Sequence, residues 1–340
     1  LSNCLLRQNS QQLFPESGVR LANFGKNARP RELMKYQSFR DFDAFASSVR
    51  DVDHVMLLQN LKRPAWSIRK VNLAGVHLQL GSEGSGNITE GRSRSDGYVL
   101  FMPLTHVGDH SANGTALDEN SFAILEPGCD LCVRCPIEHD WCSVYVPTDM
   151  LVRDYDLVKP WSASEKTMVR VIRANPQIAY QFRSLVDQIM IAAATGSHFE
   201  STRAATCAAA ELLKIASFVV ARQQVIEFSR QGRPKVPRQE IIRRSMKLLE
   251  QRVGDPVQVD ELATVADVSQ RTLRTAFQEY FGLGPVRYLQ LRQLHQVHRA
   301  LKAADPEVVT VSRAFADHGA WAFGRFSARY RQLFGELPSE

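Results

Sequence analysis

The sequence predicts an α+β fold. An N-terminal β-barrel or sandwich is followed along the chain by a helical segment and then by an all-α C-terminal domain. Three observations lead to this prediction. Short apolar runs separated by Gly and Pro fill residues 71–147, as in small barrels and sandwiches. Apolar residues at helical spacing follow over residues 162–228. Beyond residue 237, a pattern of short helix, tight turn and longer helix occurs twice, with a long helix between the copies.

The predicted strands are read from alternation and from turn residues. Val76, Leu78 and Leu80 alternate with polar residues, which is the period of a half-buried strand. A loop is expected over the glycine-rich residues 81–87, and residues 41–46 could open a short helix. Further apolar strands end at Pro or Gly turns: residues 98–102, 121–125 and 141–146.

Two apolar stripes predict the helices of residues 162–228. Their members lie three or four residues apart, as on one face of a helix: Val186, Ile189, Met190 and Ala193 in one stripe, and Ala208, Leu212, Ile215 and Val219 in the other. The basic, turn-rich residues 229–236 then read as a linker. We therefore expect an N-terminal domain over residues 1–228 and a C-terminal domain over residues 237–340.

Residues 259–280 form the first short-helix and long-helix pattern, a helix-turn-helix motif. We expect the inner face of the short helix to carry Leu262, Ala263 and Val265, with Val268 buried in the turn. Ser269 suits the N-cap of the second helix. On that helix Leu273, Ala276 and Phe277 should face the core, while other side chains face outwards, as a recognition helix requires: Gln270, Arg271, Arg274 and Thr275.

The second motif occupies about residues 309–333. Residues 311–318 are expected to form the short helix, Gly319 the turn and residues 321–333 the second recognition helix. Between the motifs, Pro285 suits a first helical position and opens a helix to Ala303. Its 19 residues give a strut of roughly 28 Å, and one DNA turn is ~34 Å. Such a strut can place two helices in successive major grooves.

Residues 237–340 closely resemble the DNA-binding domain of the AraC/XylS family of bacterial transcription regulators. Both motifs, the connecting helix and the endings Phe281-Gly282 to Pro285 and Phe334-Gly335 to Pro338 fall in the family's order. Two positions depart from it. The family's Arg-Leu pair in the connecting helix reads Gln293-Leu294 here, and its Gly-Phe reads Gly319-Ala320. Trp321 could supply the missing bulk.

The resemblance implies double-stranded promoter or operator DNA as a partner. The residues expected at the DNA are Ser269, Gln270, Arg271, Thr272, Arg274, Thr275, Arg325, Ser327 and Arg329. The second helix carries Ala322, Phe323 and Gly324, which cannot hydrogen-bond to bases through their side chains. We therefore expect the first motif to read sequence and the second mainly to contact the phosphate backbone.

The resemblance also implies that the N-terminal half senses an effector and dimerises. It looks like a cupin-like barrel with a helical pair, in a cytoplasmic, homodimeric, ligand-responsive activator that acts with RNA polymerase. The effector's identity stays open. His77, His106 and His110 could line its pocket, although lone histidines are commonly ordinary core or surface residues.

Five residues raise a metal or redox alternative. Cys129, Cys132, Cys135, His139 and Cys142 offer enough thiolate and imidazole for zinc or an iron–sulfur cluster. Free cysteines are, however, often small buried residues, and strand alternation would separate Cys132 from Cys135. The prediction is therefore no metal and no cofactor, with a metal- or thiol-based redox sensor kept as the alternative reading.

Other classes of protein find less support. The chain has 340 residues, 44% apolar, with a net charge of +6 that suits a polyanion without identifying one. There is no long apolar run for a membrane span, and no apolar signal run near residue 1, so a cytoplasmic location is expected. A catalytic barrel of the cupin type would need a His-x-His pair, which is missing, as are phosphate-binding and nucleophile-elbow motifs. We therefore expect no catalytic residues and no enzyme.

Overall fold

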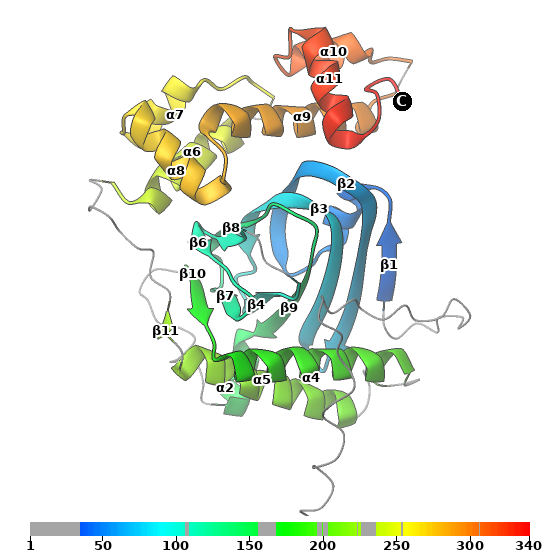
Figure 1. Cartoon of the computed structure of the whole chain (residues 1–340), viewed down its shortest axis with the longest axis vertical. Coiled ribbons are helices and arrows are strands. Elements are labelled where there is room, and N and C mark those ends of the chain that lie inside the picture. Colours follow the sequence, from blue (N-terminus) through cyan, green and yellow to red (C-terminus); the bar gives the residue numbers. More distant parts are fainter. Residues whose placement is uncertain are drawn as a thin grey trace, which may run out of the picture. The chain divides into compact units, whose positions relative to one another are not determined.

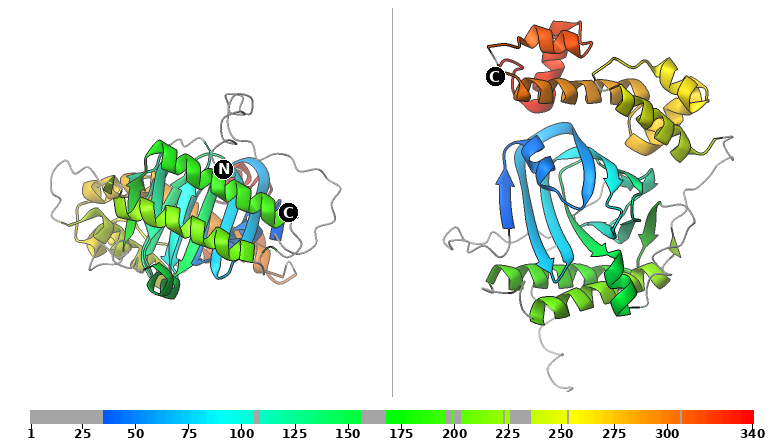
Figure 2. Two further views of the ribbon diagram at one scale, coloured as in Figure 1. Left: turned by 90° about the horizontal axis from the view of Figure 1, so that it is seen from below. Right: turned by 180° about the vertical axis from the view of Figure 1, so that it is seen from behind.

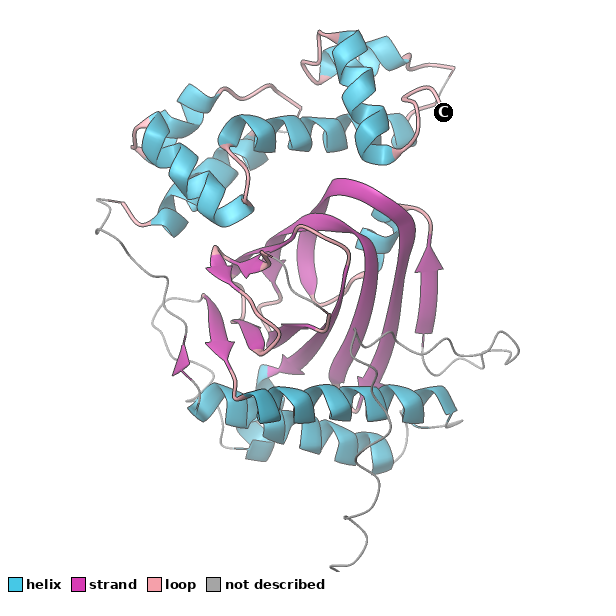
Figure 3. Ribbon diagram, in the orientation of Figure 1, coloured by secondary structure: helices cyan, strands magenta, loops and turns pink. Residues whose placement is uncertain are grey.

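The computed structural model describes residues 35–105, 109–155, 168–195, 199, 203–222, 224–225, 236–252, 254–305 and 307–340. It confirms the predicted fold class: a nearly closed antiparallel β-barrel is followed in the chain by a helical pair and then by a set of helices alone (Figures 1 and 3). His106 and residues 229–235 of the predicted linker lie outside the described residues. None of the described helices is both long and apolar enough to cross a membrane.

One antiparallel sheet curves into the barrel. Its two long strands, β2 (Val52–Leu73) and β3 (Val76–Ser93), form a hairpin, and β1 (Lys35–Phe39) pairs with β2. The order across the rest of the sheet is β11-β10-β7-β4-β9-β3-β8-β5-β6. These strands are β4 (Gly97–Pro103), β5 (Ser111–Ala112), β6 (Thr115–Ala116), β7 (Ser121–Leu125), β8 (Asp130–Cys135), β9 (His139–Pro147), β10 (Val169–Arg173) and β11 (Gln224–Val225).

Two long helices, α4 (Pro176–Thr195) and α5 (Arg203–Arg222), lie side by side across one end of the barrel (Figure 2). The predicted stripe on α4 is buried: Val186, Ile189, Met190 and Ala193. The rings of Phe122 on β7 and Phe182 on α4 meet edge to face at 5.1 Å, so the helices complete the apolar core of the barrel. Two short helices, α1 (Phe42–Ser48) and α2 (Thr148–Tyr155), flank the strands.

The chain from residue 238 onwards is helical. Its elements are α6 (Arg238–Gln251), α7 (Val259–Ala266), α8 (Gln270–Phe281), α9 (Pro285–Ala303), α10 (Val311–Asp317) and α11 (Phe323–Phe334). Gly282 and Gly335 end α8 and α11 in the left-handed conformation, with φ of 66° and 79°, which glycine adopts without the steric penalty of a Cβ. The same residue type therefore ends both long helices of the two motifs.

The glycine-rich residues 81–87 are not a loop, and this prediction was wrong. They continue strand β3, where Gly81 pairs with Trp141 of β9 and Gly86 pairs with Asn60 of β2. A Cβ on Gly81 would lie 2.2 Å from the Trp141 ring, and one on Gly86 would lie 2.3 Å from the backbone of Pro136. Glycine is needed because neighbouring groups approach the strand closely, and not because the chain turns.

Two further boundaries differ from the prediction. Strands were expected over residues 71–147, but β2 already begins at Val52, and most of its middle section is exposed and irregular, which hides its alternation. Helices were expected over residues 162–228, but Val169–Arg173 form strand β10. Pairing with β7 buries Val171 and Ile172 there, and such β-branched residues favour a strand. Residues 156–167 lie outside the described part of the chain.

Candidate nucleic-acid interface and barrel pocket

The first helix-turn-helix motif is defined by its caps. A capping box opens α7, where the backbone N–H of Gln258 donates to Glu261 Oε2 at 2.7 Å. Asp267 then takes the left-handed conformation, with φ of 55°, which Asp tolerates better than most residues. The hydroxyl of Ser269 accepts a hydrogen bond from the backbone N–H of Thr272 at 3.2 Å and caps α8. This turn sets the angle at which α8 leaves α7.

The inward face of the motif differs in two places from the prediction. Leu262 and Ala263 are buried as expected, but Val265 is 44% exposed, and Ala266 takes the inner position instead. Val268 is half-buried. The reason is helical phase, because Leu262 and Ala266 are four residues apart on one face whereas Val265 is turned away from it.

The outward face of α8 carries the predicted polar set. Gln270, Arg271, Arg274 and Thr275 are exposed, while Leu273, Ala276 and Phe277 are buried. The Gln270 amide is hydrogen-bonded to Asp260 of α7. Ser269 and Thr272 serve the cap first, since their hydroxyls lie 3.0 Å apart. Arg271 and Arg274 are therefore the side chains of this helix with the longest free reach.

The second motif repeats this plan with different groups. Thr310 caps α10 through the backbone N–H of Arg313 at 3.3 Å, and Gly319 makes the turn with φ of 69°. α11 begins at Phe323, so Trp321 precedes the helix, contrary to prediction. Trp321 is 74% exposed, whereas Ala320 is buried. Trp321 therefore does not supply the missing bulk, and the edges of Phe323 and Phe326 pack on Phe315 instead.

Gln293 holds the second motif to the connecting helix. Its side-chain amide donates to the carbonyl oxygen of His318 at 2.7 Å, and His318 ends α10. The Gln293-Leu294 departure from the family pattern therefore still joins α9 to α10. Sequence reasoning singled out this position but missed its role.

Five exposed arginines lie on the two recognition helices: the four predicted ones, and Arg331 in the last turn of α11. Within the described residues, no carboxylate pairs with Arg271, Arg274, Arg325 or Arg329. Arginines on and next to α6 are paired instead: Arg243 and Arg244 bind Glu240 at 2.7 Å, and Arg252 binds Glu261 at 2.5 Å. The half-buried Ser327 lies between Arg325 and Arg329 on α11. Free guanidiniums on such helices suit the phosphates and base edges of DNA.

A second candidate site is a pocket inside the barrel. It is a cavity of about 60 Å³ with largely apolar walls, from Val99, Phe101, Leu125 and Val133 among others. Glu83, Asn87, His139 and Trp141 form its polar side. Glu83 accepts hydrogen bonds from Trp141 Nε1 at 2.7 Å and from Asn87 Nδ2 at 2.5 Å. Burial raises the pKa of Glu83 to about 8, against the lowering effect of those two donors.

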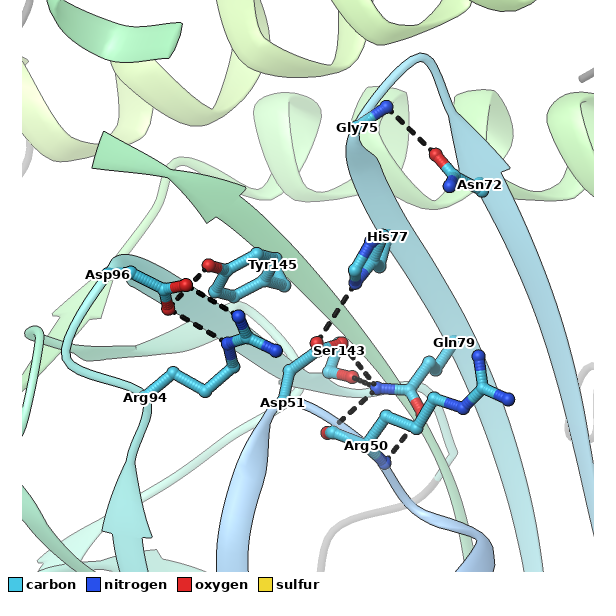
Figure 4. A network of polar contacts seen from close by, with 10 residues as sticks. All are labelled: Arg50, Asp51, Asn72, Gly75, His77, Gln79, Arg94, Asp96, Ser143 and Tyr145. Carbon is cyan, nitrogen blue, oxygen red and sulfur yellow. Dashed lines mark hydrogen bonds and ion pairs between the residues drawn. The ribbon is translucent and has the colours of Figure 1, made fainter. Parts of the chain in front are cut away.

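His77 belongs to a different part of the barrel. Figure 4 shows its ring beside Asp51, with Nδ1 2.9 Å from Oδ1. The buried amide of Gln79 donates to Asp51 at 3.3 Å and to Ser143 Oγ at 3.3 Å. Next to this network, Arg94 binds Asp96 at 2.5 Å, and Asp96 also accepts from the Tyr145 hydroxyl. His77 therefore lines a shallow hollow with Arg94 and Tyr145, and not the pocket inside the barrel.

The cysteine cluster read from the sequence does not assemble as one group. Cys129, Cys132, Cys135 and Cys142 are all buried and free. Of the five candidates, Cys135 and His139 come together, and they do so with His110 and not with the other cysteines. Burial raises the pKa of Cys129 to about 11 and of Cys142 to about 12. Such thiols stay protonated, and reactive cysteines need the thiolate.

Residues 262–340 match the family model for a helix-turn-helix domain. The chain is 30% identical over 132 residues to the XylDLEGF operon transcriptional activator 2 of Pseudomonas putida, a match that covers 39% of this chain and 78% of that protein. It is 33% identical over 107 residues to a probable thc operon regulatory protein of Rhodococcus erythropolis, covering 32% of each.

The matched share differs between relatives. In the XylDLEGF operon transcriptional activator 3 of Pseudomonas putida, the match spans 29% of that protein's length.

Among solved structures, the chain is similar to the AraC-like transcriptional activator CuxR, with 12% identity, a TM-score of 0.42 and coverage of 78% of this chain and 95% of that one. A similarity to ToxT from Vibrio cholerae has 10% identity, a TM-score of 0.28 and coverage of 91% and 97%.

Proposed function

This chain belongs to the AraC/XylS family of transcription regulators, and on that premise we propose that it is a ligand-responsive activator that binds operator DNA through both motifs. The observation that carries the proposal is the set of five exposed arginines on α8 and α11, for which the described part of the chain offers no carboxylate partner. Each helix buries its apolar face and carries exposed guanidiniums, two on α8 and three on α11, as suits a helix in a major groove.

The two recognition helices, α8 and α11, contact different parts of the DNA in this proposal. α8 carries Arg271 and Arg274 beside polar Gln270 and Thr275, and Arg pairs bidentately with guanine O6 and N7. α11 begins with Phe323 and Gly324, which offer no side-chain hydrogen bond, and Ser327 is half-buried. α8 is therefore the reader of sequence, and Arg325 and Arg329 contact phosphates.

Selection of operators from randomised half-sites tests this division. Arg271→Ala or Arg274→Ala should remove the preference at particular base pairs, because a bidentate contact contributes roughly 1–3 kcal/mol of discrimination. Arg329→Ala should weaken binding to all sequences alike and lower the slope of log affinity against log salt by roughly one unit. Arg243→Ala is the matched control, since its guanidinium is already bound by Glu240. Base preference that changes in Arg329→Ala but stays intact in both α8 variants would reverse the assignment.

The effector binds in the pocket inside the barrel. Its apolar walls and its polar side of Glu83, Asn87, His139 and Trp141 suit a small, mainly apolar molecule with one group that forms hydrogen bonds. Val133→Trp would fill this space from the barrel wall. This variant should bind the operator with the affinity of the unaltered protein. In single-round transcription by RNA polymerase, metabolites that activate the unaltered protein should have no effect on the variant. Full activation of Val133→Trp would place the effector elsewhere.

A further inference from the structure

Two side chains that line the pocket, together with a buried histidine beside them, have the composition of a metal site. His110, Cys135 and His139 each offer one ligand atom, and these atoms lie within 4.8 Å of one another. All three residues are at most 5% exposed. Imidazole and thiolate are the ligands that Zn²⁺ binds in proteins, at about 2.0–2.3 Å, so a shift of about one ångström would bring the three atoms around one ion.

The barrel places these groups by strand pairing. Cys135 ends β8 and His139 begins β9, so a short turn separates them. On the neighbouring strand β3, Asn87 pairs with Cys135 and Glu83 pairs with His139. Paired residues of adjacent strands share a face, and all four line the pocket. Glu83 Oε1 lies 3.6 Å from His139 Nε2, which brings a carboxylate to the same place.

Hydrogen bonds around the group fix its orientation as at known metal sites. Nδ1 of His139 lies 2.9 Å from the carbonyl oxygen of Ile137. Nδ1 therefore carries the proton, and Nε2 keeps its lone pair for a metal. Glu83 is held by Trp141 and Asn87. Ligands at metal sites are typically oriented by backbone carbonyls and side-chain donors of this kind.

We propose that His110, Cys135 and His139 bind a divalent transition-metal ion of the Zn²⁺ class inside the barrel, with the Glu83 carboxylate as the fourth ligand. The Cys135 thiol and the Glu83 carboxyl release their protons to solvent when the ion binds. The ion then provides the positive charge that balances a carboxylate and a thiolate in an apolar cavity. This site shares Glu83 and the pocket with the proposed effector site, but it is independent of the DNA-binding proposal, since its residues belong to β3, β8, β9 and the position just before β5.

The test uses the full chain, freed of metal with a chelator and titrated with Zn²⁺ against a chromophoric competitor. One ion per chain is expected. Cys135→Ser and His139→Gln should weaken the affinity by more than about 100-fold, and Glu83→Gln by about 10-fold, on the scale that losses around metal sites take. The exposed Cys207→Ser and the buried Cys142→Ala are matched controls that should bind as tightly as the unaltered chain.

Co²⁺ provides a readout that does not depend on the variants folding. The unaltered chain loaded with Co²⁺ should show a thiolate-to-metal charge-transfer band and the strong visible bands of four-coordinate cobalt, and both should persist in Cys142→Ala. Circular dichroism of each metal-free variant shows whether it is folded. No stoichiometric Zn²⁺ binding, Co²⁺ spectra without a thiolate band, or equal affinity in folded Cys135→Ser and Cys207→Ser would each overturn the proposal.

Discussion

At the scale of single residues, the arginines of the C-terminal helices have two roles. Those on α6 are neutralised by carboxylates of the same chain, while the residues that the structure describes offer no carboxylate to those facing outward on α8 and α11. The sequence shows only that all are basic. Whether a guanidinium is free depends on which carboxylates the fold brings close to it, and the sequence does not show this. The prediction of Arg271, Arg274, Arg325 and Arg329 as DNA-contacting residues therefore rested on the helical phase alone, which places them on the outward faces.

Glu240 gives a prediction about pH. Hydrogen bonds from Arg243 and then from Arg244 lower the pKa of Glu240 to about 2. A lowered pKa in the folded state stabilises the fold above the carboxyl's ordinary pKa of 4.5 and ceases to do so as the pH falls towards 2. Because the pair is largely exposed, solvent screening limits its contribution to about 0.5–1 kcal/mol. Glu240→Gln should therefore lower the free energy of unfolding by that amount at pH 7 and by nearly nothing at pH 2.

Chemical denaturation at several pH values would measure this difference. Glu250→Gln on the same helix is the control, because no ion pair of Glu250 is found among the described residues. An equal loss of stability at pH 7 and pH 2, or an equal effect of both substitutions, would contradict the account.

At the scale of elements, helices and compact strands could be predicted, and long irregular strands could not. The helices of both motifs follow from caps, turns and apolar spacing that lie within a few residues of each other. The glycines of β3 look like a loop because the groups that require them, the Trp141 ring beside Gly81 and the backbone of Pro136 beside Gly86, lie sixty and fifty residues further along the chain. The pocket residues Glu83 and Asn87 were missed for the same reason, since they lie in that stretch.

Gly81 allows a test of this close approach. Gly81→Ala would place a methyl group 2.2 Å from the rigid, buried ring of Trp141 and should destabilise the barrel by about 1–3 kcal/mol. Combining it with Trp141→Leu removes the ring. In a double-mutant cycle measured by denaturation, the pair should cost clearly less than the sum of the single changes. Additive losses would mean that the methyl group is accommodated without the ring.

At the scale of the whole molecule, α4 and α5 cover the barrel with one face and leave another outside. Tyr180 and Ile191 on α4 are 58% and 49% exposed. They are eleven residues apart, which is close to three helical turns, so they lie on one stripe. Exposed apolar stripes of this kind mark association surfaces, and the predicted homodimer would use this one.

Sedimentation of the full chain at micromolar concentration tests the dimer. The unaltered chain should sediment as a dimer. The double substitution Tyr180→Glu and Ile191→Glu should raise the dissociation constant of the dimer at least tenfold, because each charge would be buried in the interface without a partner. Val308→Glu, at an exposed valine between α9 and α10, should leave the dimer unchanged. A monomeric unaltered chain would remove the basis for the dimer.

The length of α9 has a consequence for the operators that such a protein can use. The helix runs unbroken from Pro285 to Ala303, and each end is joined to a motif by a short connection. Adding one residue would rotate the distal motif by about 100° and move it by about 1.5 Å, which turns a reading face away from its groove. The length of α9 therefore fixes the spacing of the two half-sites. The bases preferred within each half-site can change through substitutions on α8 or α11 alone. Related regulators with a connecting helix of this length should accordingly bind half-sites of different base sequence. The spacing between their two half-sites should be the same.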